Sequence, residues 1–139
     1  MMPEAKIMSA LPRRAILVVD DESFIRLVAA DILEDAGATV FEAADAEEAL
    51  AMLDAHHDIA LVFTDVNMPG SMDGIDLVAS VHRIKPAIQW IVTSGRQRYR
   101  QDELPDDATF LAKPYRAGEL IKLATEKLNA GDETRDQSA

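Results

Sequence analysis

Short apolar runs rich in β-branched residues alternate along this chain with segments of helical periodicity, and this alternation limits the possible folds more than any other feature. The run "AILVVD" at 15–20 is almost continuously apolar, as is typical of a strand buried on both faces. Comparable runs predict strands at 39–43, 58–64, 88–93 and 109–112. Strands that alternate with helices predict a parallel sheet covered on both faces, and we expect one α/β domain spanning 14–130.

Four segments carry apolar residues at the spacing of an amphipathic helix. They lie at 22–36, after Asp45, at 74–84 and at 115–129. Asp45 and Glu48 form a capping-box pattern at the start of the second helix.

The remaining segments of the chain lack these patterns. Residues 95–107 contain Pro105 and paired acids, so we expect at most about two helical turns there. We expect 1–13 to be a flexible N-terminal segment and 131–139 to be a disordered polar tail.

The composition excludes several classes of function. The 139 residues include 25 acids and 14 bases, and a net charge of -11 disfavours direct binding to nucleic acid. The absence of cysteine excludes disulfides, thiolate zinc sites and thiol nucleophiles. The sequence shows neither a signal-peptide pattern nor an apolar run long enough to span a bilayer, so we expect a cytoplasmic protein without a membrane partner.

Charged and hydroxyl-bearing residues follow four of the predicted strands at their carboxyl ends. These are Asp20 and Asp21 after the first strand, Asp65 after the third, Thr93 and Ser94 after the fourth, and Lys113 after the fifth. Ligands of open α/β sheets bind at this edge, so we expect these side chains to converge there. An aspartate at the end of a buried strand is costly unless it is paired or bound to a metal, which makes Asp65 a candidate reactive group.

The chemistry of this set favours a metal-assisted phosphoryl site. Three carboxylates in one cleft repel one another unless a cation lies among them. Oxygen ligands without His or Cys indicate Mg²⁺, with Mn²⁺ as the alternative metal. Carboxylate, metal, lysine and hydroxyl together can hold a phosphoryl group, with a carboxylate oxygen as the nucleophile.

Four motifs in the same order resemble the receiver domain of two-component response regulators. They are "ILVVDDE", "TDVNMPG-SMDG", "IVTSG" and "FLAKPY", and the resemblance covers about residues 14–130. It implies a doubly wound, flavodoxin-like fold with strand order 2-1-3-4-5. It also implies a stand-alone, single-domain regulator, because no output domain follows in this sequence.

The resemblance implies a role for each residue of the cleft. Asp65 is then the phosphoacceptor, and the metal is held by Asp20, Asp21, Asp65 and the backbone oxygen of Asn67. Lys113 pairs with the phosphoryl oxygens and precedes Pro114 in a cis peptide, while Ser94 donates to the phosphoryl group and Phe110 moves with it. Ser94 is preferred to Thr93 because it precedes Gly95 and because neighbouring strand residues point to opposite faces.

The expected partners are proteins. A histidine kinase or a phosphotransfer protein supplies the phosphoryl group, an unknown downstream protein receives the signal, and the chain itself is a monomer or a weak homodimer. The chain is then not an enzyme beyond its own phosphorylation and slow dephosphorylation at Asp65. Arg96, Arg98, Tyr99 and Arg100 form a candidate partner surface, with an ordinary solvated face as the alternative.

The three histidines, His56, His57 and His82, are interpreted as structural or solvated, and Trp90 as a packing residue.

Rival functions from other classes remain open at this stage. A dehalogenase-like phosphatase requires a second acid at the position of Asn67, and a flavodoxin-like cofactor site conflicts with Asp20 and Asp21 after the first strand. Neither G-x-G-x-x-G nor G-x-x-x-x-G-K-[ST] occurs. A receiver-like adaptor that works without phosphorylation is the main alternative.

Overall fold

Five parallel strands form the centre of the molecule. The structure is a computed structural model that describes the backbone of residues 14–138 and the side chains of residues 14–130. The strands are β1 (Ala15–Val19), β2 (Thr39–Ala43), β3 (Ile59–Asp65), β4 (Gln89–Ser94) and β5 (Ala108–Ala112). Their order in the sheet is β2-β1-β3-β4-β5 and every neighbouring pair is parallel, which confirms the expected fold.

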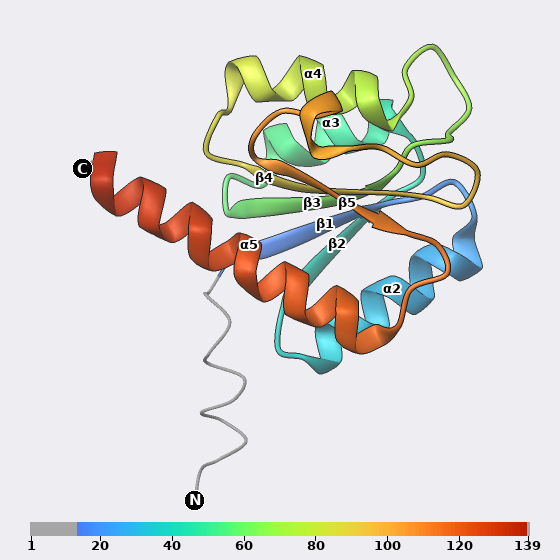
Figure 1. The fold of residues 1–139 in the computed structure, drawn as a ribbon, viewed down its shortest axis with the longest axis horizontal. Coiled ribbons are helices and arrows are strands. Elements are labelled where there is room, and N and C mark those ends of the chain that lie inside the picture. The colour runs from blue at the N-terminus through green and yellow to red at the C-terminus, as the bar shows by residue number, and fades with distance from the viewer. Residues whose placement is uncertain (1–13, 139) are drawn as a thin grey trace, which may run out of the picture.

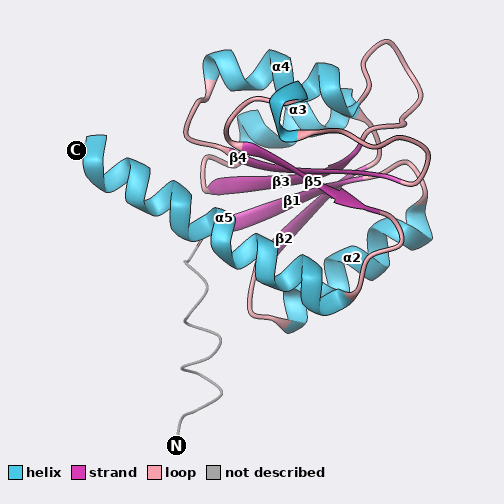
Figure 2. Ribbon diagram, in the orientation of Figure 1, coloured by secondary structure: helices cyan, strands magenta, loops and turns pink. Residues whose placement is uncertain are grey.

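The helices cover both faces of this sheet. They are α2 (Ser23–Asp35), α3 (Ala46–Ala55), α4 (Gly74–Ile84) and α5 (Ala117–Ser138). Helices α3 and α4 lie on one face of the sheet, and α2 and α5 lie on the other (Figure 1). The same three-layer arrangement is visible when the chain is coloured by secondary structure (Figure 2).

Alternation along the strands divides the core into two layers. In β1, Leu17 and Val19 pack in the layer under α3 and α4, whereas Ile16 and Val18 pack under α2 and α5. All five residues of β1 are buried, and Trp90 of β4 is fully buried, as expected for a packing residue. Each fully buried aliphatic side chain contributes roughly 1.5 to 3 kcal/mol, so the apolar runs of the sequence determine this architecture.

Side-chain caps set the starts of two helices. Asp45 Oδ1 accepts from the backbone N–H of Glu48 at 2.8 Å, and Glu48 Oε1 accepts from Ala44 N at 2.7 Å. Asp73 and Asp76 form a reciprocal capping box at the start of α4. Each cap stabilises its helix by about 1 kcal/mol, and the capping box of α4 ends the loop that follows Asp65.

The segment between β4 and β5 agrees with the expectation of at most about two helical turns, whereas α5 is longer than expected. Between β4 and β5 the only helical turn is the short 3₁₀ helix η1 (Gln101–Glu103), and Gln101 Nε2 anchors it by donating to Ala108 O at 2.7 Å. Helix α5 continues to Ser138, so 131–138 extend the helix where a disordered polar tail was expected. The segment 1–13, expected to be flexible, lies outside the described residues.

The register of the sheet places the chemically active residues along one edge. Asp65, the last residue of β3, pairs with Thr93 of β4, and Ser94 pairs with Ala112 of β5, one residue before Lys113. The carboxyl ends of all parallel strands lie at the same edge, so this register brings the motifs together.

No helix within residues 14–138 is both long and apolar enough to cross a bilayer.

Candidate phosphoryl-acceptor site

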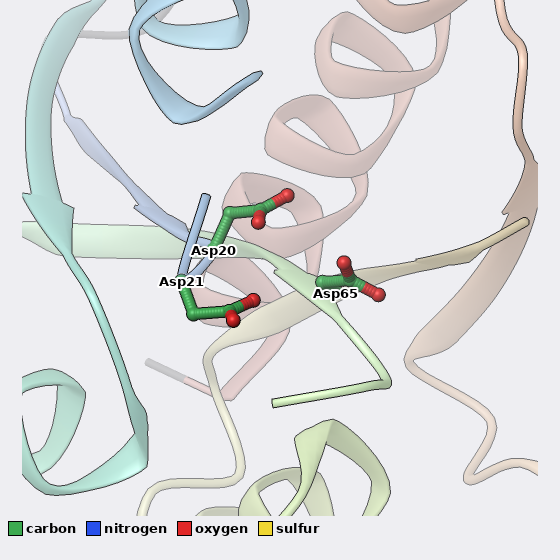
Figure 3. A group of neighbouring side chains, drawn as sticks. All are labelled: Asp20, Asp21 and Asp65. Atoms are coloured by element: carbon green, nitrogen blue, oxygen red, sulfur yellow. The ribbon is translucent and has the colours of Figure 1, made fainter. Parts of the chain in front are cut away.

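Three aspartates meet at the carboxyl ends of β1 and β3. One carboxylate oxygen from each of Asp20, Asp21 and Asp65 lies within 4.8 Å of the others. Figure 3 shows that the three side chains come from two adjacent strand ends and gather in one region. Asp20 and Asp65 are buried, while Asp21 is exposed at the rim. Three oxygen donors at this spacing can surround a small divalent cation.

Backbone N–H groups fix the two buried carboxylates. Glu22 N donates to Asp20 Oδ1 at 2.9 Å, and Asn67 N donates to Asp65 Oδ1 at 3.1 Å. Arg26 Nη1 holds the main chain at the same point, because it donates to the carbonyl oxygen of Asp20 at 2.7 Å. No sequence pattern indicated this role for Arg26, which lies on the face of α2 next to β1.

Lys113 lies between the two buried carboxylates. Its Nζ is 2.9 Å from Asp65 Oδ2 and 3.5 Å from Asp20 Oδ2. Burial by itself would lower the pKa of Lys113, but the carboxylates of Asp65 and Asp20 raise it above its ordinary value. The ammonium therefore stays charged at neutral pH and offsets part of the local negative charge.

Asp20 is in an unfavourable environment for a charged carboxylate. Burial raises its pKa above the ordinary value, and the charge of Asp65 adds to this effect. The hydrogen bond from Glu22 N and the charge of Lys113 act in the opposite direction without cancelling it. A buried acid whose charge is incompletely offset, beside two further carboxylates, fits a site that takes up a cation.

An open cleft of about 610 Å³, called the acceptor cleft below, gives access to the three aspartates. Asp21, Asp65, Asn67 and Lys113 are among the residues that line it. Gly95 also borders the cleft, and a Cβ at that position would meet Lys113 Cβ at 3.6 Å, which is ordinary contact. The peptide between Lys113 and Pro114 is cis, as expected. The cleft is large enough for a phosphoryl group to reach Asp65.

The structure distinguishes the two neighbouring hydroxyls of β4. Ser94 is fully buried on the side of α3 and α4, and its Oγ accepts from Asn67 Nδ2 at 3.1 Å. Thr93 points to the opposite face of the strand, and its buried Oγ1 has no hydrogen-bond partner among residues 14–130. Ser94 is therefore the hydroxyl connected to the loop that follows Asp65, as the alternation argument predicts.

The four residues expected to form a partner surface lie in different environments. Arg96 lines the acceptor cleft, and the ring of Tyr99 packs edge-on against Phe110 with centroids 5.8 Å apart. Arg98 is exposed, and Arg100 is exposed beside Asp102, with Arg100 Nε 3.1 Å from Asp102 Oδ1. The arginines at 96, 98 and 100 are exposed, and a partner surface at these four residues stays a prediction.

Gly74 is a site residue that the sequence analysis did not identify. A Cβ at Gly74 would overlap with the carbonyl oxygen of Asp65 and would lie 2.9 Å from Val66 Cα. The N–H of Gly74 donates to Val66 O at 2.9 Å, so the start of α4 is joined directly to the end of β3. The motif "MDG" contains this glycine, but nothing in the motif indicated a contact with Asp65.

The histidines lie away from the aspartate cluster. His56 stacks on Phe41 with ring centroids 4.0 Å apart, and His57 Nε2 lies 3.1 Å from Asp54 O. His82 Nδ1 lies 3.0 Å from Asp107 Oδ2. Each of them contacts groups that belong to the scaffold, so none of these contacts contributes to the acceptor cleft.

Comparisons with known proteins agree with this geometry. The family profile of the response regulator receiver domain matches residues 16–125. The chain is 35% identical over 124 residues to the sensor kinase CckA of Brucella abortus, covering 84% of this chain and 13% of that protein. It is 38% identical over 122 residues to an uncharacterised 14.6 kDa protein of Leptolyngbya boryana, covering 84% of this chain and 91% of that one.

A solved structure has the same fold. The CheY-like response regulator receiver domain protein from Methanospirillum hungatei superposes with a TM-score of 0.78 at 28% identity, covering 87% of this chain and 98% of that chain. Several relatives are much longer, and the chain spans only 25% and 55% of two transcriptional regulators that it matches. The chain belongs to the receiver domain family of two-component response regulators. Within that family it corresponds to a single receiver domain.

Proposed function

We propose that this chain is a single-domain response regulator that accepts a phosphoryl group on Asp65 from a histidine kinase or a phosphotransfer protein, in a reaction that depends on Mg²⁺. The observation that carries the proposal is the position of the Asp65 carboxylate between Lys113 Nζ, at 2.9 Å, and the carboxylates of Asp20 and Asp21. A nucleophilic carboxylate with a cation on one side and a metal-binding acid pair on the other matches the requirements of phosphoryl transfer.

The proposed step forms one bond and breaks one bond. A carboxylate oxygen of Asp65 attacks the phosphorus of a phosphohistidine, so that an O–P bond forms while the N–P bond breaks. The electron pair of the broken bond stays with the imidazole of the donor. The product is a mixed anhydride on Asp65 whose negative charge resides on the phosphoryl oxygens, about -1.5 to -2 charges at neutral pH.

The residues of the cleft fit a divalent metal in this reaction. Asp20, Asp21, Asp65 and the backbone oxygen of Asn67 would hold Mg²⁺, or Mn²⁺ in its place, and the metal would offset charge on the transferred group. Lys113 performs the same task from the other side, because its ammonium lies against both buried carboxylates. Asp65 can then carry additional negative charge in a cleft that is already acidic.

The response would begin at Ser94. None of the residues in the described part of the chain accepts the hydrogen of the Ser94 hydroxyl, although its oxygen accepts three N–H groups. A phosphoryl oxygen on Asp65 supplies an anionic acceptor, and charge-assisted hydrogen bonds are about twice as strong as neutral ones. Movement of Ser94 then allows Phe110 to turn inward and Tyr99, which packs against Phe110, to change position. The result is a changed surface for a downstream protein or for onward phosphotransfer.

An apolar groove beside the cleft supports a protein as the phosphoryl donor. This groove, of about 510 Å³, is lined by Phe24, Val28, Pro114 and Tyr115 and shares Gly95 and Lys113 with the acceptor cleft. Phe24 is 75% exposed, which is a high value for a large apolar side chain. A helical protein that covered this groove would bring a phosphohistidine directly to Asp65.

Intact mass spectrometry after incubation with a small acyl phosphate and Mg²⁺ tests the proposal. We expect the native chain to gain one phosphoryl group, to lose this gain when EDTA is present, and to gain nothing as Asp65→Asn. Asp58→Asn is the matched control, because Asp58 is an exposed acid at the opposite end of the same strand. A native chain that gained no mass with any donor or metal would instead support a receiver-like adaptor that works without phosphorylation.

A further inference from the structure

Asn67 connects the proposed phosphoryl acceptor with the buried hydroxyl of Ser94. Its backbone N–H donates to Asp65 Oδ1 at 3.1 Å, and its side-chain Nδ2 donates to Ser94 Oγ at 3.1 Å. One residue therefore contacts both of the groups whose hydrogen bonds must change when a phosphoryl group arrives.

The Ser94 oxygen has more donors than it needs. It accepts from the backbone N–H groups of Arg96 and Gln97, each at 3.1 Å, in addition to the Asn67 side chain. A hydroxyl oxygen offers two lone pairs, so the turn at Arg96 and Gln97 already satisfies it. The bond from Asn67 is therefore not required to satisfy Ser94, and it ties β4 to the loop after β3.

We propose, on the basis of the function proposed above, that the Asn67 carboxamide is a latch that holds the Ser94 hydroxyl in its unphosphorylated position. Ser94 must break this hydrogen bond before it can approach a phosphoryl oxygen. Asn67 is thus a positioning residue that acts through Ser94, and its side chain makes switching more costly in the resting protein.

Phosphorylation would itself weaken the hold of Asn67. When one carboxylate oxygen of Asp65 is bonded to phosphorus, the other becomes a neutral carbonyl oxygen, and a neutral acceptor binds an N–H group less strongly than a carboxylate does. The backbone bond from Asn67 to Asp65 Oδ1 is therefore weaker in the phosphorylated state, whichever oxygen is modified. Asn67 is freed at the same time as Ser94 gains its new acceptor, so the two changes reinforce each other.

A double-mutant cycle separates this latch from a direct effect of Asn67 on the phosphoryl group or the metal. The probe is beryllofluoride with Mg²⁺, a stable mimic of the phosphoryl group, and the measured quantity is its apparent dissociation constant. We expect Asn67→Ala to lower this constant about threefold to tenfold, the factor that corresponds to the loss of one neutral hydrogen bond from the resting state. In the Ser94→Ala background, where no oxygen remains to be held, Asn67→Ala should change nothing.

Ser71→Ala is the matched control, because Ser71 is an exposed polar residue of the same loop. An Asn67→Ala effect of equal size in both backgrounds, or no effect in either, would overturn the latch.

The backbone amides of Arg96 and Gln97 give a second readout that needs no phosphoryl mimic. Both amides donate to Ser94 Oγ, so their NMR resonances report its position directly. We expect Asn67→Ala to shift both resonances and Ser71→Ala to leave them in place. If beryllofluoride bound no variant, the proposed function would fail while these resonances still tested the latch. Unchanged resonances in Asn67→Ala would refute the latch by themselves.

Discussion

Gly74 packs so closely against Asp65 that no side chain fits between them. A Cβ built on Gly74 overlaps with the carbonyl oxygen of Asp65, and the N–H of Gly74 donates to the next carbonyl along the chain, that of Val66. The first turn of α4 thus packs against the backbone of Asp65, the residue proposed to accept the phosphoryl group. The position of Asp65 depends on a glycine nine residues further along the chain.

Gly74→Ala is expected to damage both stability and the acceptor site. Relief of the overlap requires the start of α4 to move away from β3, at a cost of about 3 kcal/mol, the upper part of the range for overpacked sites. Chemical denaturation measures this loss, and intact mass measures the accompanying fall in phosphorylation. Gly118→Ala is the control, because Gly118 lies in the first turn of α5 and a Cβ there meets nothing within 4 Å. That variant should gain up to about 1 kcal/mol from helix propensity. A Gly74→Ala protein as stable as the native chain would contradict the packing described here.

Asp20→Asn is expected to stabilise the metal-free protein at pH 7. Burial raises the pKa of Asp20, so the folded state holds a proton more tightly than the unfolded state does. Ionised Asp20 therefore costs stability above its ordinary pKa of 3.8, and this cost develops as the pH rises from about 3.8 through the raised value. Thermal melts should show a higher Tm for Asp20→Asn at pH 7, by a few degrees, for a gain of about 1 kcal/mol.

The pH profile and the response to Mg²⁺ complete this test. The difference between Asp20→Asn and the native chain should shrink as the pH falls below about 4, because both chains then carry a neutral group at position 20. Mg²⁺ should raise the Tm of the native chain more than that of the variant, because ligand binding stabilises only the state that binds it. Asp31→Asn, at an exposed position on α2, should remain within about 0.5 kcal/mol of the native chain. A lower Tm for Asp20→Asn would show that its ion pair with Lys113 outweighs its burial.

Lys113→Met is expected to strengthen Mg²⁺ binding while it weakens phosphorylation. The ammonium lies 2.9 Å from Asp65 Oδ2 and 3.5 Å from Asp20 Oδ2, so it neutralises ligand charge and repels a second cation. Removal of one positive charge at this range, screened by partial exposure to solvent, should increase Mg²⁺ affinity roughly fivefold to tenfold. Isothermal titration calorimetry measures the affinity, and intact mass measures the phosphoryl gain. Lys122→Met is the control, because Lys122 is exposed on α5. Unchanged Mg²⁺ affinity in Lys113→Met would place the metal elsewhere.

Phe24→Ala is expected to separate the two kinds of phosphoryl donor. Phe24 is 75% exposed in the apolar groove beside the cleft and contributes little to the core. Its removal should leave stability and acyl-phosphate phosphorylation unchanged, but it should slow transfer from a phosphorylated histidine protein at least tenfold, as the loss of an aromatic anchor typically does. Leu50→Ala, at a 37% exposed position on α3, is the matched control. Equal slowing with both donors would assign Phe24 to the reaction centre instead of to docking.

The sequence predicted the parts of this molecule that depend on local pattern. Apolar runs predicted the strands, and the acids that follow two of them predicted the cluster of Asp20, Asp21 and Asp65, because parallel strands place their carboxyl ends at one edge. The strand order came with the family resemblance and not from the spacing. A disordered polar tail was expected at 131–139, whereas α5 continues through Ser138 in the structure.

Other features depend on the three-dimensional path of the chain and left no pattern to detect. The contact between Gly74 and Asp65 and the bond from Arg26 to the Asp20 carbonyl are of this kind. Arg96 was grouped with Arg98 and Tyr99 by sequence proximity, yet only Arg96 borders the acceptor cleft. The direction of each side chain in 95–100 was not predictable, because no regular period governs a segment outside helix and strand.

Two adjacent hydroxyls stand at the end of β4, and the pairing of β4 with its neighbours decides which of them can serve. Asp65 lies opposite Thr93 and Ser94 lies opposite Ala112. A slip of one residue in β4 would turn every one of its side chains to the other face. Thr93 would then occupy the place of Ser94, and its side chain would bring an additional methyl group to that place. Gly95 would no longer lie next to Lys113. Such a chain could be compact and still unable to signal, so accurate strand pairing during folding is a condition of information transfer as well as of stability.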